Sequence, residues 1–468
     1  QDAFATIQAG VNAVAVGGTV NVASGTYAGA TITKSVTLLG ANAGVAGYAA
    51  RAAESIINNG QITVSCTSAE IDHLVEVAGF RFAGTGYTIR GGDPSPTTDF
   101  VFRNNLVDGK TLGDDQITIS SAQRWRDVSF LSNKFANIGL NALVVSNVRT
   151  LTVVDNDFAD VNFNAIQLTG ANSINIVSNR IDTTGKEAIK LGGPIGGGVC
   201  SYNTILNANT SCGDDRGGIR IRGVTLPYSV TIANNIISNS FNGVAVKDGE
   251  SLAGATLLVT NNCFVGNSNA GVYNGGTGAL VANGNYWGEA TPNMAEHVAG
   301  DVTVDTYYAA YDAETGVFSD LRYLTVYVDS AADEDATHFK TLAGAVAAVA
   351  PGGTIHVAAG TYNESVTLAK PVSLIGPETG EKPLVVGMIT ATHTTGWTTR
   401  IENIDFKVNA TDKNNLKLVG VKNLTVKGCD FDAAGRFMTV PQVVAVQLGG
   451  TCQNITFDTC TFRDGYYV

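Results

Sequence analysis

The segment GGTVNVASGTYAGATITKSVTLLG, from Gly17 to Gly40, recurs with few changes as GGTIHVAAGTYNESVTLAKPVSLIG, from Gly352 to Gly376. Apolar and polar residues alternate along both copies, which is the pattern of short, half-buried strands. Each copy follows a segment whose apolar residues are spaced three and four apart, as on one face of an amphipathic helix. The repeated segment therefore predicts two similar beginnings, each a short helix that caps the open end of a stack of strands.

The two capping helices are expected near residues 3–15 and 338–350. Their apolar stripes consist of Phe4, Ile7, Val11 and Val14 in the first helix and of Phe339, Leu342, Val346 and Val349 in the second. A glycine pair ends each helical pattern. The two caps predict two tandem modules, covering residues 1–320 and 321–468, of which the second is incomplete at its C-terminal end.

A second motif recurs between the caps: an alternating strand, an asparagine, any one residue and then an apolar residue. The shared asparagines are Asn105, Asn133, Asn156, Asn179, Asn203, Asn235 and Asn262, at steps of 23 to 32 residues. Short strands at this spacing predict the successive coils of a parallel β-helix, in which each coil buries its apolar side against its neighbours. The asparagines are expected to hydrogen-bond from coil to coil at one corner. Cys429 and Cys460 occupy the same position in the second module.

The composition excludes several classes of protein. With 44% hydrophobic and 15% charged residues the 468-residue chain is not disordered, and its net charge of −12 makes it a poor ligand for nucleic acid. No apolar run approaches the ~18 residues of a membrane span. The seven cysteines show no C-x-x-C spacing and are expected to be buried apolar residues. No signal peptide is present, although a secreted protein loses one on maturation.

The cap, the repeated GGT line, the asparagine corners and the motif NYWG at Asn285 to Gly288 resemble right-handed parallel β-helix proteins of the pectate-lyase-like superfamily. The resemblance is strongest to surface proteins with tandem β-helix modules. It implies an all-β fold, a right-handed parallel β-helix, and a place outside the cell or at its surface. Because the superfamily includes lyases, glycoside hydrolases, adhesins and structural proteins, the resemblance does not decide the function.

A basic column is the most unusual local feature. Aligning the strands that recur between the asparagines puts their outward residues in register, as the pairs Thr118/Ser120, Val144/Ser146, Gln167/Thr169, Lys190/Gly192, Arg220/Arg222, Ala245/Lys247 and Tyr273/Gly275. Adjacent coils lie about 4.8 Å apart, so the stacked cations repel one another unless something compensates them. One interpretation is an ion-pair network with acids of the flanking turns, namely Glu187, Asp214, Asp215, Asp248 and Glu250.

The other interpretation is a groove for an acidic polysaccharide. In a uronate lyase, Arg220 or Arg222 would neutralise the substrate carboxylate, Lys190 would act as the base and Tyr273 would stack on a sugar ring. Lys247 and Gln167 are further candidates for binding the glycan.

Calcium is the metal for which this region offers ligands. Asp214 and Asp215 are the candidates, although two carboxylates fall short of the six or more oxygens that calcium takes. The same pair of acids raises a glycoside hydrolase as a third hypothesis. No Asn-Thr-Asp, Gly-His-Gly or Arg-Ile-Lys motif of the polygalacturonase-like enzymes is present.

The sequence thus favours a structural or adhesive surface protein that needs no cofactor, self-associates through open β-helix ends and contacts glycans. A polysaccharide lyase is the alternative, and an enzymatic role is the less favoured of the two.

Overall fold

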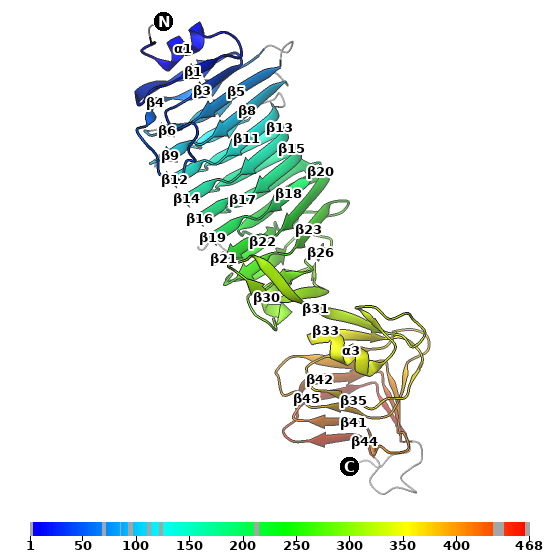
Figure 1. Cartoon of the computed structure of the whole chain (residues 1–468). Helices are drawn as coiled ribbons and strands as arrows, with labels where there is room; N and C mark the ends of the chain where they lie inside the picture. The colour runs from blue at the N-terminus through cyan, green and yellow to red at the C-terminus, as the bar shows by residue number, and fades with distance from the viewer. Residues whose placement is uncertain are drawn as a thin grey trace. The chain divides into compact units, whose positions relative to one another are not determined.

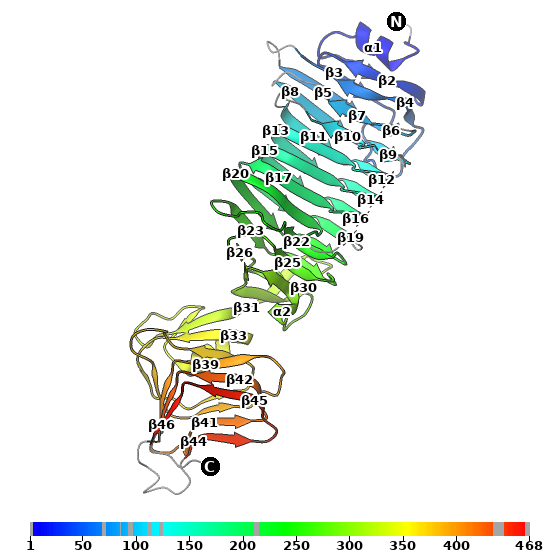
Figure 2. The ribbon, with the colours of Figure 1, turned by 180° about the vertical axis from the view of Figure 1, so that it is seen from behind.

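The computed structural model describes residues 3–67, 72–84, 86–91, 97–109, 114–120, 125–209, 215–433 and 444–463. The chain forms two compact units: unit 1 consists of Gln1–Gly288 and Met294–Thr303, and unit 2 of Glu289–Asn293 and Val304–Val468. Both are parallel β-helices (Figures 1 and 2). The division lies nearer to residue 304 than to the expected 320. The reason is that β30 (Thr306–Asp312) pairs antiparallel with β31 (Val317–Val328) and so joins unit 2.

The coils of unit 1 run over three faces of parallel strands. Face 1, before the asparagine corner, contains β1 (Thr19–Asn21), β3 (Val36–Leu39), β5 (His73–Ala78), β8 (Thr98–Arg103), β11 (Trp125–Leu131), β18 (Gly198–Ser201), β23 (Thr256–Thr260), β26 (Leu280–Val281) and β29 (Val302–Thr303). Face 2, after the corner, contains β6 (Phe80–Phe82), β9 (Leu106–Asp108), β12 (Lys134–Ile138), β14 (Asp157–Val161), β16 (Arg180–Thr184), β19 (Thr204–Ala208), β21 (Ile236–Ser238), β24 (Cys263–Val265) and β27 (Asn285–Tyr286). Face 3 contains β7 (Ile89–Gly91), β10 (Ile117–Ile119), β17 (Ile189–Ile195), β22 (Asn242–Val246), β25 (Ala270–Asn274) and β28 (Val298–Gly300).

Five longer strands of unit 1 continue from one face to the next. They are β2 (Gly25–Ile32) and β4 (Ser55–Val64), from face 2 to face 3, and β13 (Leu143–Val154), β15 (Ile166–Val177) and β20 (Ile219–Ala233), from face 3 to face 1. Two helices, α1 (Ile7–Ala13) and α2 (Met294–His297), belong to the same unit.

The predicted asparagine ladder is confirmed. The Nδ2 of Asn133 lies 2.9 Å from the Oδ1 of Asn156, and the same contact is repeated from coil to coil between Asn105 and Asn285. The residue before each ladder asparagine has a positive φ, for example 58° at Asp155, which turns the chain from face 1 to face 2. The asparagine side chains therefore hydrogen-bond the buried polar groups along this corner. Side chains without amides would leave those groups unpaired.

Unit 2 repeats this architecture. Its face 1 contains β31, β33 (Val349–Val357), β36 (Ser373–Ile375), β39 (Thr399–Glu402), β42 (Lys422–Lys427) and β45 (Gln453–Asp458), with β32 (His338–Phe339) beside β31. Face 2 contains β34 (Thr361–Tyr362), β37 (Leu384–Val386), β40 (Asp405–Lys407), β43 (Asp430–Asp432) and β46 (Thr461–Arg463). Face 3 contains β35 (Val366–Leu368), β38 (Ile389–Ala391), β41 (Asn414–Val419) and β44 (Val444–Gly449).

The corner cysteines of unit 2 replace the asparagines as the sequence indicated. The Sγ of Cys429 lies 3.6 Å from the carbonyl oxygen of Ile401 on the preceding coil, where a ladder asparagine of unit 1 places its Nδ2. Cys429 is buried and Cys460 is partly exposed. All six cysteines in the described ranges are free.

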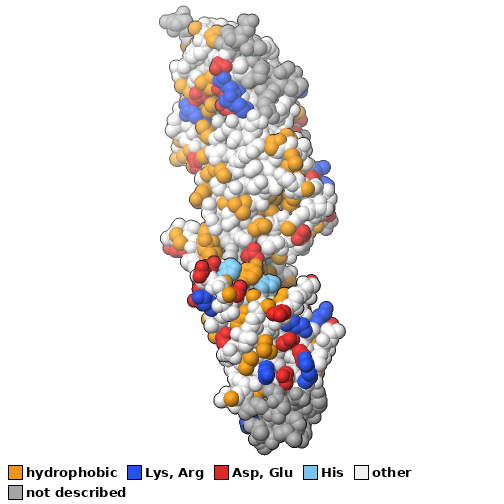
Figure 3. Space-filling model, turned by 90° about the vertical axis from the view of Figure 1, so that its right-hand side faces the viewer, with side chains coloured by type: hydrophobic (Ala, Val, Ile, Leu, Met, Phe, Trp, Pro, Cys, Tyr) orange, Lys and Arg blue, Asp and Glu red, His pale blue; other side chains and the backbone are white. Residues whose placement is uncertain are grey.

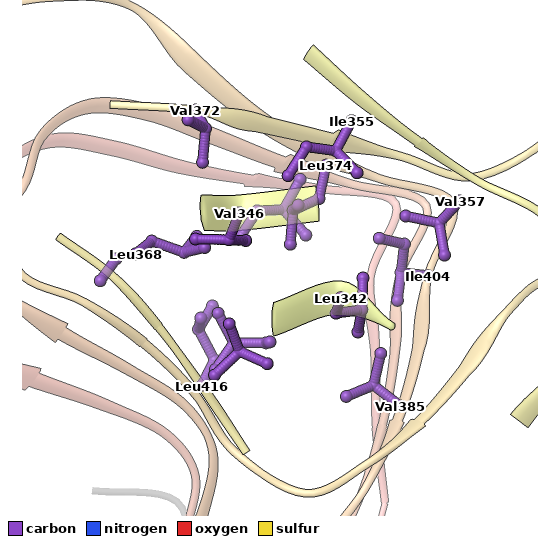
Figure 4. Close-up of a cluster of buried hydrophobic side chains, with 14 of the residues drawn as sticks. Leu342, Val346, Ile355, Val357, Leu368, Val372, Leu374, Val385, Ile404 and Leu416 are labelled. Carbon is purple, nitrogen blue, oxygen red and sulfur yellow. The ribbon is translucent and has the colours of Figure 1, made fainter. Parts of the chain in front are cut away.

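Each unit is capped by a short helix over the end of its core. In unit 2, Leu342 and Val346 point from α3 (Leu342–Ala348) into a cluster that includes Ile355 and Leu374 (Figure 4). In unit 1, Ile7 and Val11 are each only 2% exposed. The side chains of Thr6 and Thr341 cap the N-termini of the two helices. Phe4 departs from the expected stripe, because α1 begins at Ile7, and it is 50% exposed.

Across the described ranges, no helix is both long enough and apolar enough to span a membrane.

Candidate functional site

The basic column has the expected register on face 3 of unit 1. Gln167 is the cross-strand partner of Lys190, Lys190 of Arg220, and Arg220 of Ala245, which in turn pairs with Tyr273. Among the second residues, Ser146, Thr169 and Gly192 pair in the expected register, but the register is lost at Arg222. The pairing of β17 with β20 shifts after Leu191, so that Gly193 rather than Gly192 continues it.

Arg220 is the centre of a buried ion-pair network. Its Nη1 lies 2.7 Å from Oε1 of Glu187, and its Nη2 lies 2.7 Å from Oδ1 of Asp215. Only 4% of the Arg220 side chain and 1% of the Glu187 side chain are exposed. Two carboxylates therefore compensate the guanidinium, and almost none of its surface is left for a ligand. Of the two arginines expected to neutralise a substrate carboxylate, Arg220 or Arg222, the burial of Arg220 leaves Arg222 as the better-placed candidate.

One of the two candidate calcium ligands, Asp215, belongs to the described residues, and it pairs with an arginine. Asp215 is committed to Arg220 through one oxygen, while its other oxygen lies 3.4 Å from the backbone nitrogen of Asp248. Asp214 lies outside the described residues. In the described ranges, His, Cys, Asp and Glu residues form no group of three or more that could hold a metal ion. An aspartate paired with an arginine is a poor ligand for a cation, so the geometry of Asp215 fits the ion-pair interpretation better than a calcium site.

Lys190 lies beside this network and is half-buried. Its Nζ lies 3.1 Å from Oε1 of Gln167, which also accepts a hydrogen bond from Nδ2 of Asn164 at 3.1 Å. Burial lowers the pKa of the Lys190 ammonium, and the positive charge of Arg222 lowers this pKa further. Lys190 therefore releases its proton more readily than an ordinary lysine, as a general base requires.

Arg222 is the exposed cation of the column. Among the described residues, no carboxylate or other hydrogen-bond acceptor pairs with its side chain. Lys247, which follows β22, is half-buried and donates to the carbonyl oxygen of Asp248 at 2.9 Å. Arg222, Lys190 and Lys247 thus supply the positive charge that the column offers to an outside ligand.

The remaining turn residues have structural partners. The hydroxyl of Tyr273 donates to Oδ1 of Asp248 at 2.7 Å, and the Glu250 carboxylate accepts hydrogen bonds from the backbone nitrogens of Gly223 and Val224. Of the flanking acids, Glu187 and Asp215 therefore form the predicted ion pairs with the basic column. Asp248 instead accepts a hydrogen bond from Tyr273, and Glu250 accepts hydrogen bonds from the backbone of a turn.

Sequence reasoning missed Arg216, whose Nη1 lies 3.3 Å from Oε1 of Glu187. Its place directly after the acidic pair at residues 214 and 215 was a usable signal, because a turn that carries both signs of charge can fold onto a buried acid. Arg216 and Arg220 together surround Glu187. Away from such clusters, the side of unit 1 in Figure 3 shows few charged side chains over its middle coils.

No curated protein matches the chain. Two similar solved structures are those of PL6 family alginate lyase AlyGC, one of a point mutant and one without a mutation in its description. Each is 12% identical in sequence, and the match covers 96% of this chain and 79% of the lyase. The TM-scores are 0.35 for the mutant and 0.26 for the other.

Two family models match different parts of the chain. Residues 116–286 match the model described as right handed beta helix region. Residues 328–466 match the model described as protein of unknown function (DUF1565). The coil geometry and the first of these matches together identify the fold as the right-handed parallel β-helix, which is the fold of the pectate-lyase-like superfamily.

Proposed function

We propose that the chain is an extracellular or cell-surface protein with a structural or adhesive role, and that face 3 of unit 1 contacts an acidic glycan. The observation that carries the glycan contact is Arg222, an exposed cation without an acidic partner in the described part of the chain. Lys190 and Lys247 belong to the same column. Uronate carboxylates are the glycan groups that such a cluster attracts.

The structural role is supported by how the chain uses its polar residues. The ladder asparagines are buried and hydrogen-bonded from coil to coil. Arg220, the most buried cation of the column, forms an internal ion pair. Fully satisfied buried networks make a fold rigid and specific. A rigid stack of coils is suited to presenting a binding face at a distance from the point of attachment.

Binding should be tested with a panel of uronate polysaccharides at several salt concentrations. We expect saturable binding that weakens as salt rises, because exposed charge pairs are screened. Arg222→Ala should weaken binding about tenfold, the effect of losing one charged hydrogen bond. Arg149→Ala is the matched control, since Arg149 is also an exposed arginine but is paired with Asp127. Absence of binding, or equal weakening by both variants, would refute the glycan contact.

A polysaccharide lyase is the second candidate, and the lowered pKa of Lys190 beside Arg222 favours it. In the reaction the Lys190 amine would take the proton next to the uronate carboxylate, and Arg222 would neutralise that carboxylate. The electron pair of the broken C–H bond would form a carbon–carbon double bond, and the glycosidic oxygen would leave and take a proton from water. Ultraviolet absorbance of the unsaturated product tests this step. Product formation that Lys190→Met abolishes would establish the lyase, whereas binding without product supports the adhesive role.

A further inference from the structure

One segment of unit 1 leaves the coils and runs along the outside of the asparagine corner, beside β6 and β9 (Figure 1). This segment, residues 40–54, connects β3 with β4 and is called the strap below. It hydrogen-bonds to one turn residue on each of four successive coils, namely Gly79, Asn104, Ser132 and Asp155. The strap is therefore an ordered element of the fold, because its own polar groups are paired along its course.

A tyrosine and a glycine anchor the middle of the strap. The hydroxyl of Tyr48 donates to Oδ2 of Asp155 at 2.6 Å, and the backbone nitrogen of Gly47 donates to the carbonyl oxygen of Ser132 at 2.8 Å. Gly47 lies so close to the coils that a Cβ atom there would be 2.1 Å from the carbonyl oxygen of Asn105. Only glycine fits at this position, so the close approach of the strap depends on it.

A cavity of about 370 Å³ lies between the strap and face 2. Its lining includes Tyr48, Arg51 and Glu54 of the strap and Leu106, Asp108 and Lys134 of face 2. This volume lies within the range of roughly 300–1,000 Å³ that small-molecule sites occupy. The cavity exists because the strap crosses the coils at this point, and it is distinct from the basic column on face 3.

The charges of the lining are compensated. Arg51 and Lys134 are its cations, and Glu54 and Asp108 are its anions. Each has a partner of opposite charge: Glu54 for Arg51 at 2.7 Å, Arg81 for Asp108 at 3.6 Å, and Asp157 for Lys134 at 3.6 Å. A charged ligand would have to compete with these partners, so the cavity favours a ligand that is polar and neutral.

The lining also combines apolar surface with hydrogen-bonding groups. Leu106 and Ala136 come from the adjacent strands β9 and β12, and the Tyr48 side chain is 42% exposed. Asn137 donates to Oδ1 of Asp108 at 3.0 Å, which holds an amide and a carboxylate side by side at the edge of the cavity. A pyranose ring matches this combination, because its C–H groups pack against aromatic and aliphatic side chains while its hydroxyls both donate and accept hydrogen bonds.

We propose that the strap and face 2 form a binding site for a neutral sugar, a hexopyranose unit of an uncharged glycan. The sugar ring packs against Tyr48 and Leu106, and its hydroxyls hydrogen-bond with Asp108, Asn137 and Lys134. The site does not depend on the acidic glycan proposed for face 3, since the two sites share no residue.

The proposal is tested by titrating the whole chain with the methyl glycosides of glucose, galactose and mannose in a calorimeter. Methyl glucuronide serves as the charged probe. We expect saturable binding of at least one neutral glycoside, with the same affinity at low and high salt, because a neutral ligand forms no charge pair for salt to screen. Methyl glucuronide should bind more weakly. The contact proposed for face 3 weakens as salt rises, so the two proposals can fail independently.

Two glycines of the strap supply a matched pair of variants. Gly47→Ala forces the strap away from the coils and should weaken binding at least about tenfold. Gly44→Ala is the control, because a Cβ atom at Gly44 would meet no described atom within 4 Å, and it should bind normally.

A second pair of variants keeps the test decisive if Gly47→Ala does not fold. Tyr48→Ala removes the ring and should weaken binding about tenfold, whereas Tyr48→Phe keeps the ring and should bind nearly as well as the parent protein. The proposal is overturned if no neutral glycoside binds, if methyl glucuronide binds best, or if the members of either pair behave alike in folded protein. Binding that Arg222→Ala abolishes and Tyr48→Ala leaves unchanged would place the sugar on face 3 and would also overturn it.

Discussion

The guanidinium of Arg220 and the carboxylate of Glu187 form a charge pair, with 2.7 Å between Nη1 and Oε1, and 4% and 1% of the two side chains are exposed. Asp215 adds a second carboxylate at 2.7 Å from Nη2. The pair holds the turn before β20 against the coil that carries β17. Arg220, which the sequence places in the middle of a basic surface, therefore stabilises face 3 through a buried ion pair.

Arg220→Met should destabilise unit 1 strongly. The substitution leaves the buried carboxylate of Glu187 without its closest cation, and the free energy of unfolding should fall by about 3–5 kcal/mol. Arg222→Ala, two residues along the same strand, should change it by less than about 0.5 kcal/mol, because that side chain is exposed. Urea denaturation followed by circular dichroism measures both. Equal losses in the two variants would contradict the assignment of Arg220 to an internal ion pair.

Lys190 should make the stability of unit 1 rise with pH in the alkaline range. Its pKa is lowered in the folded state by burial and by Arg222, while in the unfolded chain it has the ordinary value near 10.4. Between these two values the unfolded state binds more protons than the folded state, so the free energy of unfolding increases with pH. The contribution of Lys190 is fully present above the unfolded pKa and is lost as pH falls through the folded pKa.

Lys190→Met removes this titration. The variant should be more stable than the parent protein below the folded pKa of Lys190, and the difference should shrink toward zero as pH rises past the ordinary lysine pKa. Thermal unfolding at a series of pH values measures it. In an Arg222→Ala background the pKa of Lys190 should be less depressed, so the gain from Lys190→Met should be smaller. A gain that does not change with pH would show that the substitution acts through packing alone.

The asparagine corners and the register of the column were predictable because they depend on local repeats. One residue type recurs at one turn, and parallel coils place equivalent positions in register. The burial of Arg220 was not predictable in this way. It depends on how the turn residues Asp215 and Arg216 fold over face 3, and turns differ in length from coil to coil.

The boundary between the units was also not predictable from the sequence repeats alone. The hairpin of β30 and β31 pairs residues through a turn that breaks the coil period, so repeat counting placed the division within unit 2. Likewise, Phe4 continues the helical spacing, but α1 starts only at Ile7, where Thr6 caps the helix. Periodicity identifies which residues share a stripe, whereas capping decides how far the helix extends.

Asn156→Ala should weaken the corner ladder on both sides. Its Nδ2 donates to Asn179 at 2.9 Å and its Oδ1 accepts from Asn133 at 2.9 Å, so the substitution leaves buried donors and acceptors unpaired on two coils. The free energy of unfolding should fall by at least about 2 kcal/mol. Asn175→Ala is the control, because Asn175 belongs to the outward, exposed side of β15. Equal effects of the two substitutions in denaturant unfolding would mean that the ladder contributes little to stability.

Lys34 and Lys370 should stabilise the two capping helices to a similar extent. The Nζ of Lys34 lies 2.5 Å from the carbonyl oxygen of Val14, the C-cap of α1, and Lys370 donates in the same way to Val349, the C-cap of α3. A cation at the carbonyl end of a helix also interacts favourably with its dipole. We expect Lys34→Met and Lys370→Met each to cost about 1 kcal/mol in unfolding free energy. Each should also speed amide exchange in its own helix and leave exchange in the other helix unchanged. Lys427→Met, at an exposed lysine, serves as the control. Unchanged exchange in both helices would show that the glycine pair and the buried apolar stripe hold the caps without the lysines.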